Sequence, residues 1–286
     1  MMQVIVLSNN RIFQKYFEKI APSNFTINSD LNDISSFNSS VVITDSTEII
    51  PVVKNYFSSK KKNILIFVSG VYKLKKENNF SYEFYFLNNI ISSLATKEVV
   101  PTKVTPLQIG QNAVIEESKI EENIKYISEL SIDKIISFAN EFSIPRKVRD
   151  DIIIASSEII DNIIEINTLL NKFIVKIKMI FTLDRDTLEI TISDCIGLAD
   201  IYSISNSLEN AVILSDSRLS NYMSFRGRGY TLMRKTSDFV MTKILGPKSF
   251  RKYKESEPFT ETRILYLLKS KKHRDKPSLG VVMEFF

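Results

Sequence analysis

A predicted helix over residues 149–167, RDDIIIASSEIIDNIIEIN, carries four polar side chains on one face. They fall at i, i+3, i+4 and i+7, with isoleucines on the opposite arc, and are Glu158, Asp161, Asn162 and Glu165. A carboxylate one turn before an amide gives one group that can accept a proton and one that can hold a cation. Such a pair suits phosphoryl transfer, in which positioning and charge neutralisation supply most of the catalysis. A surface helix with a solvated polar face is the alternative.

Two later segments have glycines where the backbone could approach a ligand. LEITISDCIGLAD alternates as a strand that ends at Asp194, with Gly197 shortly behind it. SFRGRGYTLMRKTSDFV has Gly227 and Gly229 immediately before a helical pattern. Glycine allows close backbone approach, and the free N–H groups at a helix N-terminus attract phosphate. An ordinary loop would also explain two glycines, but the order of the three segments favours a phosphate-binding site.

In order and spacing, the three segments resemble the motifs of the histidine-kinase-like (GHKL) ATPases, and among them the anti-sigma-factor serine kinases. SEIIDNIIE resembles the N box, which implies Glu158 as general base and Asn162 as Mg²⁺ ligand. ISDCIGLAD resembles the adenine box, which implies that Asp194 accepts a hydrogen bond from the adenine amino group. FRGRGYTLMRKTSDFV is similar to the glycine-rich phosphate box and its helix. The resemblance covers residues 131–270.

The adenine box departs from the family pattern. The family has glycines two and four residues after its Asp, where this chain has Ile196 and Leu198 with Gly197 between them. A β-branched side chain at the first of these positions would crowd the base or lower nucleotide affinity. The N box often carries His four residues after its Asn, and Ile166 stands there instead.

The resemblance implies ATP and Mg²⁺ as cofactors. The residues that it places around the nucleotide are Asp194, Gly197, Gly227, Arg228 and Gly229, with residues 198–226 as a lid. The chain has one histidine, His273, in a basic loop, which argues against autophosphorylation on a dimerisation helix. The implied acceptor is a Ser or Thr hydroxyl on a partner protein. One Cys and one His cannot supply a zinc site.

Two functions from different classes stay open. The first is an ATP-dependent protein serine/threonine kinase that acts on an anti-sigma antagonist. The second is a GHKL-like scaffold that binds a sigma factor or another signalling protein without turnover. Glu158, Asn162 and Asp194 favour the kinase, whereas Ile196 and Leu198 favour the scaffold.

Residues 1–97 alternate between short apolar runs and helical spacing. The predicted strands are QVIVLS, FTINSD, SVVITDS, NILIFVS and YEFYFLN, and the predicted helices are RIFQKYFEKIA and TEIIPVVKNYFSSK. This alternation predicts an α/β domain with a five-stranded parallel sheet covered on both faces. It resembles a response-regulator receiver domain.

The receiver resemblance implies Asp45, at the end of the third strand, as phosphoacceptor. Ser69 matches the small hydroxyl residue after the fourth strand, but Asn9 and Asn10 replace the acidic pair that holds magnesium. The family's Lys after the fifth strand has no counterpart near Leu87–Asn89. Without a carboxylate cluster Mg²⁺ has little reason to bind, so we favour a pseudo-receiver that docks partners or dimerises over a working phosphoacceptor.

The domain organisation expected from these patterns has four parts. Residues 1–97 form the receiver-like domain, and 98–130 form a linker with an amphipathic helix at 115–130. This helix could dimerise, carry a signal from the receiver-like domain, or pack on the ATPase-like domain. Residues 131–270 form the GHKL-type α+β sandwich, a mixed sheet with helices on one face. Residues 271–286 are a basic tail whose apolar, strand-like end packs back on the fold.

Composition is that of an ordinary globular protein, with 44% hydrophobic and 25% charged residues. No run of about 18 uncharged apolar residues predicts a membrane span. The single cysteine fits a reducing compartment, so a cytoplasmic location is expected. The 38 basic and 33 acidic residues are scattered, and we do not expect nucleic-acid binding, which needs basic charge concentrated on one face.

Overall fold

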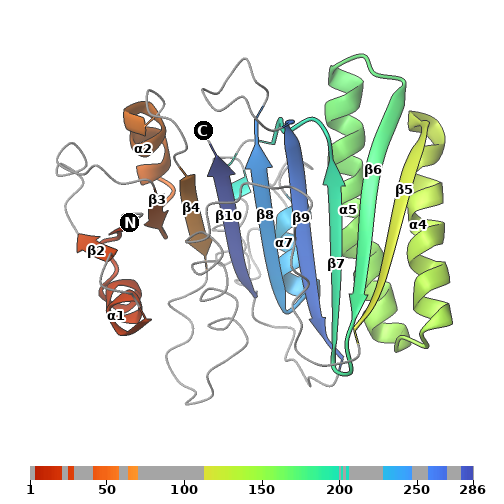
Figure 1. Cartoon of the computed structure of the whole chain (residues 1–286), viewed down its shortest axis with the longest axis horizontal. Helices are drawn as coiled ribbons and strands as arrows, with labels where there is room; N and C mark the ends of the chain where they lie inside the picture. Colours follow the sequence, from red (N-terminus) through yellow and green to blue (C-terminus); the bar gives the residue numbers. More distant parts are fainter. Residues whose placement is uncertain are drawn as a thin grey trace, which may run out of the picture.

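The computed structural model describes residues 4–20, 25–28, 41–57, 64–69, 113–199, 201, 204–205, 228–246, 257–268 and 278–285. The helices are α1 (Arg11–Ile20), α2 (Ile49–Phe57), α4 (Ile124–Glu141), α5 (Arg146–Leu169) and α7 (Arg228–Thr236). The strands are β1 (Val4–Leu7), β2 (Phe25–Asn28), β3 (Val41–Thr44), β4 (Ile64–Ser69), β5 (Val114–Asn123), β6 (Ile174–Leu183), β7 (Thr187–Asp194), β8 (Phe239–Leu245), β9 (Phe259–Leu267) and β10 (Leu279–Phe285). Within the described residues these ten strands form one mixed sheet in the order β2-β1-β3-β4-β10-β8-β9-β7-β6-β5 (Figure 1).

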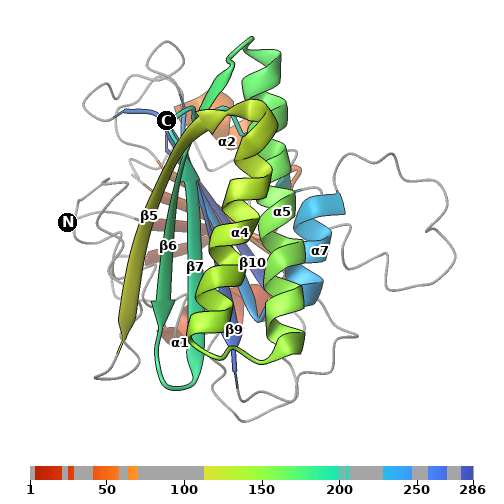
Figure 2. The same cartoon turned by 90° about the vertical axis from the view of Figure 1, so that its right-hand side faces the viewer.

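Helices pack on both faces of this sheet. Figure 2 shows α4, α5 and α7 side by side on one face. Val240 of β8 packs in their apolar cluster, and Ile244, which points to the same face, packs with α2. Met241 points to the opposite face and packs in the cluster that contains Phe13 and Phe17 of α1.

The N-terminal half, β1–β4 with α1 and α2, has the alternation that the sequence predicts. β1 pairs in parallel with β2 and β3, and β3 pairs in parallel with β4. β1, β3 and β4 are buried along their whole length, which is typical of parallel strands covered on both faces. The first four predicted strands are confirmed. The fifth, YEFYFLN at residues 82–88, lies outside the described residues.

β10 occupies the position beside β4 that a fifth parallel strand would take, so the predicted five-stranded parallel sheet is not confirmed. It runs antiparallel to β4, with Gly280 opposite Ser69, and parallel to β8 on its other edge. β10 takes this interior position because its segment is apolar toward both faces of the sheet. Val281 packs in the cluster with α1 and Val282 in the cluster with α2, so the strand is stable only between two covered neighbours.

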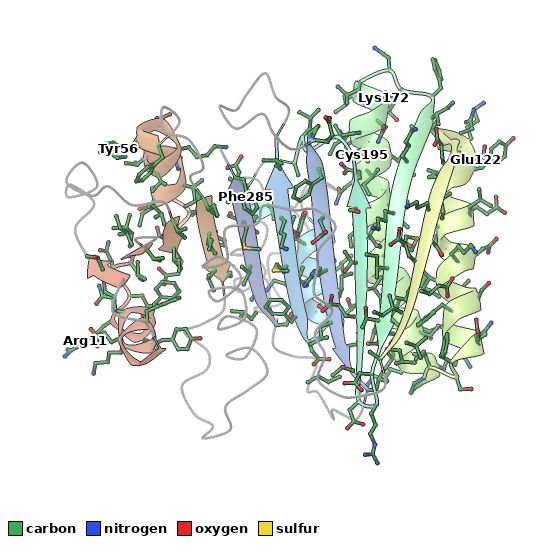
Figure 3. The ribbon with its side chains drawn as sticks, in the orientation of Figure 1. Arg11, Tyr56, Glu122, Lys172, Cys195 and Phe285 are labelled. Atoms are coloured by element: carbon green, nitrogen blue, oxygen red, sulfur yellow. The ribbon has the colours of Figure 1, made fainter. Side chains whose placement is uncertain are left out.

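The C-terminal strand thus joins the two halves of the chain in one sheet. Figure 3 labels Phe285 at the end of this strand. Its side chain packs against the apolar cluster to which both β10 and α1 contribute, so the C-terminal segment packs back on the fold as predicted. Residues 70–112 lie outside the described residues, so the predicted domain boundaries stay predictions.

The predicted helix over residues 115–130 is wrong in its first part. β5 occupies most of that stretch, pairs antiparallel with β6 along its whole length, and is followed directly by α4 at Ile124. Burial alternates along β5, where Ser118 is buried between two exposed neighbours. Cross-strand charge also favours the strand, since Glu121 lies 2.9 Å from Lys176 of β6.

The elements predicted to carry the chemistry are confirmed. α5 contains the predicted helix 149–167, and its isoleucines Ile152, Ile159 and Ile163 are buried against the sheet. β7 ends at Asp194, as its alternation predicts. Among the described helices, none is long and apolar enough to cross a membrane.

Candidate functional site

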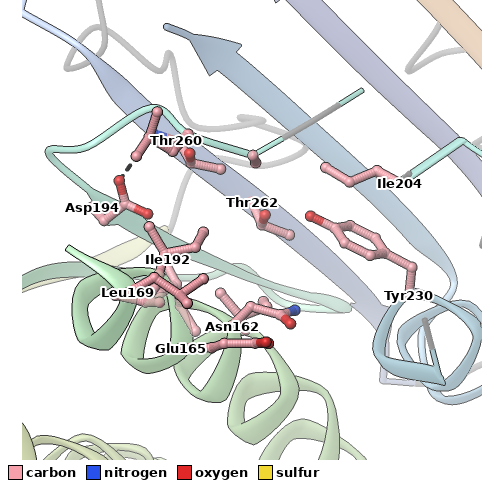
Figure 4. Close-up of a pocket in the computed structure, with 14 residues that line it drawn as sticks. Asn162, Glu165, Leu169, Ile192, Asp194, Ile204, Tyr230, Thr260 and Thr262 are labelled. Carbon is pink, nitrogen blue, oxygen red and sulfur yellow. Dashed lines mark hydrogen bonds between the residues drawn. The ribbon is translucent and has the colours of Figure 1, made fainter. Parts of the chain in front are cut away.

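A cavity of about 300 Å³ lies between α5, α7 and the strands β7 and β9 (Figure 4). Its apolar lining consists of Ile159, Ile163, Ile166, Leu169, Ile192, Leu198, Ala199 and Ile204. Its polar lining consists of Asn162, Glu165, Asp194, Tyr230, Thr260 and Thr262. Segments far apart in the chain therefore meet at one hollow with a few polar groups in an apolar wall, which is the usual composition of a small-molecule site.

Asp194 lies at one end of the cavity, where β7 ends. Its Oδ1 accepts hydrogen bonds from the backbone N–H groups of Ile196 at 2.7 Å, Gly197 at 3.3 Å and Thr260 at 3.4 Å. The side chain is 4% exposed. Burial raises the pKa of Asp194, and these backbone hydrogen bonds lower it in part. Because one oxygen makes all three bonds, the carboxylate is held in a fixed orientation and Oδ2 is left as an acceptor on a rigid support.

Glu158 and Asn162 lie one turn apart on α5, and the first turn of α7 packs on them at Gly229. A Cβ added to Gly229 would lie 2.9 Å from Glu158 Oε2 and 3.5 Å from Asn162 Nδ2. The structure therefore brings these three predicted residues together, and Asn162 also lines the cavity. Partial burial and, to a lesser degree, the charge of Asp161 raise the pKa of Glu158, which makes its carboxylate a better proton acceptor.

Gly197 serves the packing of the loop after β7. Its φ is +67°, and an added Cβ would lie 2.0 Å from the carbonyl oxygen of Leu245, so only glycine fits there. Gly197 does not line the cavity, and its predicted contact with a cofactor stays a prediction. Ile196 is 8% exposed and is absent from the lining, whereas Leu198, 36% exposed, contributes to it. Of the two departures from the adenine box, Leu198 is thus the one that shapes the cavity.

Thr260 is a site residue that the sequence analysis missed. It stands opposite Asp194 in the antiparallel register of β7 and β9. Its Oγ1 is buried without a hydrogen-bond partner, and the residue lines the cavity, so a polar group of a ligand could satisfy this hydroxyl. The segment FTETRILYLL shows two threonines on one face, but only the pairing with β7 reveals that this face meets Asp194.

Three hydroxyls form a second missed group at the other end of the cavity. Thr242 and Thr262 lie 3.1 Å apart between their Oγ1 atoms. Both are hydrogen-bonded to the hydroxyl of Tyr230, whose pKa is raised by burial and lowered in part by these bonds. Figure 4 shows the Tyr230 hydroxyl directed toward Thr262. Because the three groups satisfy one another, they hold the first turn of α7 to the sheet.

The opposite face of β9 carries a buried group of charges. Arg263 Nε lies 3.5 Å from Glu261 Oε1 and 3.7 Å from Glu189 Oε1, and Lys243 Nζ lies 3.7 Å from Glu261 Oε1. Burial raises the pKa of Glu261 and lowers that of Lys243. Alternation in the segment TETR thus directs threonines to the cavity and charges away from it.

Some of the predicted nucleotide contacts involve residues that lie outside the described part of the chain or at its limits. Gly227 and most of the predicted lid at 198–226 lie outside the described residues. Arg228 is the first residue of α7. The predicted phosphate contacts of Gly227 and Arg228 stay predictions.

The carboxyl ends of β1, β3 and β4 meet at one edge of the sheet, where the receiver resemblance placed Asp45. Asp45 follows β3 and is half-buried. Asn10 caps α1, since its Oδ1 accepts from the backbone N–H of Ile12 at 3.0 Å. Ser69 Oγ accepts from Arg234 Nη1 at 3.1 Å. Within the described residues no group of three or more His, Cys, Asp or Glu side chains could hold a metal ion.

The comparisons with known proteins leave the family open. No model of a protein family matches the chain. No curated protein sequence matches it either. Among solved structures, the chain is similar to one from the SiaB–SiaC complex of Pseudomonas aeruginosa, with 11% identity and a TM-score of 0.35 over 65% of this chain and 99% of that one.

Proposed function

We propose that this chain is a signalling protein that binds Mg²⁺-ATP in the cavity and transfers the γ-phosphoryl group to a Ser or Thr hydroxyl of a partner protein. The observation that carries the proposal is the convergence of Asn162, Asp194, Tyr230 and Thr260 on one cavity, with Glu158 packed at Gly229. These positions include the core of the three motifs that resemble the GHKL serine kinases. Sequence motifs that are far apart in the chain and meet in space support a common function.

Each polar group has a role that fits its surroundings. Asp194, fixed through Oδ1, accepts from the adenine amino group through Oδ2, and the Thr260 hydroxyl beside it completes this polar end. Asn162 would hold Mg²⁺ through its amide oxygen, and the ion would neutralise phosphate charge when bound. Oxygen ligands and a neighbouring carboxylate suit this ion, which prefers to keep several of its waters and the substrate phosphates as ligands.

Glu158 acts as the general base in this proposal. The acceptor hydroxyl oxygen bonds to the γ-phosphorus, the bond from that phosphorus to the β–γ bridging oxygen breaks, and ADP leaves with the electron pair. Glu158 takes the hydroxyl proton. Its raised pKa supports this role, because a base works best when its pKa approaches the working pH.

The partner in this proposal is a sigma factor or an anti-sigma antagonist, and the N-terminal half acts as a pseudo-receiver that receives its signal by binding a protein or a second copy of the chain. Asn10 caps α1 through a hydrogen bond to the backbone, so its side chain is already used there. This use argues against phosphoacceptor chemistry in the N-terminal half. The alternative is a scaffold without turnover. Leu198 favours it, because a leucine in the cavity wall narrows the space for adenine where the family pattern has glycine.

Calorimetric titration with Mg²⁺-ATP, together with transfer of labelled phosphate from ATP to protein, tests the proposal. Asp194→Asn should weaken binding by about 1.5–3 kcal/mol, the usual contribution of a charge-assisted hydrogen bond. Asn162→Ala should make ATP affinity less dependent on Mg²⁺. Wild-type protein that gives no signal with millimolar Mg²⁺-ATP would sink the binding claim.

Wild-type phosphate transfer separates the kinase from the scaffold, and Glu158→Gln tests whether Glu158 is the base. Binding should stay nearly intact while transfer slows by about 10²–10⁴-fold, the span of general-base catalysis. Wild-type transfer should also fall, on acidification, at a pH above the ordinary glutamate pKa of 4.5, because the pKa of Glu158 is raised. Glu129→Gln makes the same change on the exposed face of α4 and should be silent. Equal, measurable transfer rates in the two variants would refute Glu158 as the base, whereas no transfer by the wild type would favour the scaffold.

A further inference from the structure

We propose that Arg234 is a positioning residue through which the N-terminal half sets the alignment of the phosphate-binding end of α7. This inference rests on the proposed function. It assigns the route by which the pseudo-receiver would control the ATP site, and it names Ser69 as the contact on the N-terminal side.

Arg234 lies in the last turn of α7 and is 0% exposed. Its Nε donates to the carbonyl oxygen of Ser278 at 2.6 Å, and its Nη1 donates to Ser69 Oγ at 3.1 Å. Ser278 returns two bonds to the carbonyl oxygen of Arg234, from its backbone N at 2.9 Å and from its Oγ at 3.0 Å. Because this guanidinium is buried, water cannot replace the bonds of Nε and Nη1 if the side chain moves, so these two bonds hold the residue from both sides.

The two partners of Arg234 belong to the junction between the halves. Ser69 ends β4, and Ser278 immediately precedes β10, the strand that pairs with β4 on one edge and β8 on the other. Ser69 and Asp45 lie at the same end of the sheet, because β3 and β4 are parallel and both residues come at the carboxyl ends of these strands. Arg234 therefore ties α7 to the edge of the N-terminal half at which a receiver domain would carry its signal.

The first turn of α7 carries the other contact. Gly229 packs on Glu158 and Asn162, five residues before Arg234. At a rise of about 1.5 Å per residue, the two contacts are roughly 7.5 Å apart along a single helix. A helix of nine residues has no internal hinge over this length, so a shift at the Ser69 end moves the glycine end as well.

An apolar cluster gives an independent connection between the same parts. Ile204, which lines the cavity, is buried in one cluster with Phe57 of α2 and Phe67 of β4. Tyr230, also a lining residue, packs against this cluster. The wall of the cavity is thus built partly on the core of the N-terminal half.

Ser69→Ala tests the proposal, because it removes one acceptor of Arg234 without touching the cavity. We expect the Kd for Mg²⁺-ATP to rise about 5-fold, the low end of the range for coupled sites. Ser69→Thr keeps the hydroxyl and should restore the wild-type Kd. Ser8→Ala is the matched control, since Ser8 is equally buried at the same sheet edge but accepts from the backbone N of Asn10.

Hydrogen exchange distinguishes coupling between Ser69 and the ATP site from a purely structural role of Ser69. By linkage, Mg²⁺-ATP should slow amide exchange in residues 64–69 of the wild type, and Ser69→Ala should lose much of that response. A wild type that does not bind Mg²⁺-ATP refutes the proposed function, and this inference with it. A wild type that binds, with Ser69→Ala equal to it in Kd and in exchange response, refutes this inference alone.

Discussion

The substitution Gly229→Ala would place a methyl group in the contact between α7 and α5. The new Cβ would lie 2.9 Å from Glu158 Oε2, 3.3 Å from Glu158 Cβ and 3.5 Å from Asn162 Nδ2. The carboxylate oxygen is the end of a flexible side chain and can turn away, at a cost of about 0.5–1.5 kcal/mol for a strained rotamer. Alanine in a helix gains up to about 1 kcal/mol over glycine. The two effects nearly cancel, so the free energy of unfolding should change by less than about 1 kcal/mol.

The effect on catalysis should be much larger, because the displaced group is the proposed base. A shift of about 1 Å in a catalytic group can reduce the rate roughly 10²-fold. Urea unfolding and phosphate transfer, measured on Gly229→Ala, give the two quantities. Gly246→Ala is the control, since its added Cβ would make only an ordinary contact, 3.7 Å from the carbonyl oxygen of Gly197. A folded Gly229→Ala variant with the wild-type transfer rate would refute the assignment of Glu158.

Three further expectations concern other parts of the chain. Gly197→Ala should lower the free energy of unfolding, measured in urea, by about 3 kcal/mol or more. Left-handed backbone strain costs about 1–3 kcal/mol, and the clash of a Cβ 2.0 Å from the Leu245 oxygen adds to that cost. A loss below about 1 kcal/mol would contradict this expectation. Tyr230→Phe should lower stability by about 1 kcal/mol, because its two threonine partners keep their mutual bond, and an unchanged thermal midpoint would argue against the hydroxyl group described here. Acetyl phosphate should leave the protein mass unchanged, as Asn10 supplies no carboxylate for Mg²⁺; a stable added phosphate that Asp45→Asn abolishes would show a working receiver.

Local periodicity was enough to predict the elements of the candidate site. The helix 149–167 has an uninterrupted 3.6-residue pattern of isoleucines, and burial of one face is what stabilises such a helix. β7 alternates up to Asp194, which is where the strand ends. Glu158 and Asn162 needed no tertiary information, since two residues one turn apart on a helix share a face wherever that helix packs.

Residues whose role depends on pairing between distant strands could not be found in this way. Thr260 becomes a site residue only because β9 lies beside β7 in the register that sets it opposite Asp194. β5 was misassigned because isoleucines at 115, 120 and 124 suit a helix as well as a strand, and the partner strand decides between them. Pairing of Glu121 with Lys176 is part of that decision.

The sequence of β10 itself indicates a strand buried on both faces. GVVM is a continuous apolar run, which is typical of a strand buried on both faces rather than of a tail that covers one surface. Its position between β4 and β8 remained beyond local reasoning, because the strand before it in sequence is neither of its neighbours.

The shared strand has a consequence for how signals can pass between the halves. Two domains joined only by a linker can move apart, and one domain can then influence the other only when their surfaces are in contact. Here β10 is hydrogen-bonded to β4 on one edge and to β8 on the other, so removal of the N-terminal half would leave β10 as an open, apolar edge strand. The halves therefore cannot separate without breaking the sheet. The proposed regulation would therefore act through small shifts at this junction, and Arg234, bonded to both Ser69 and Ser278, lies where such a shift would reach α7.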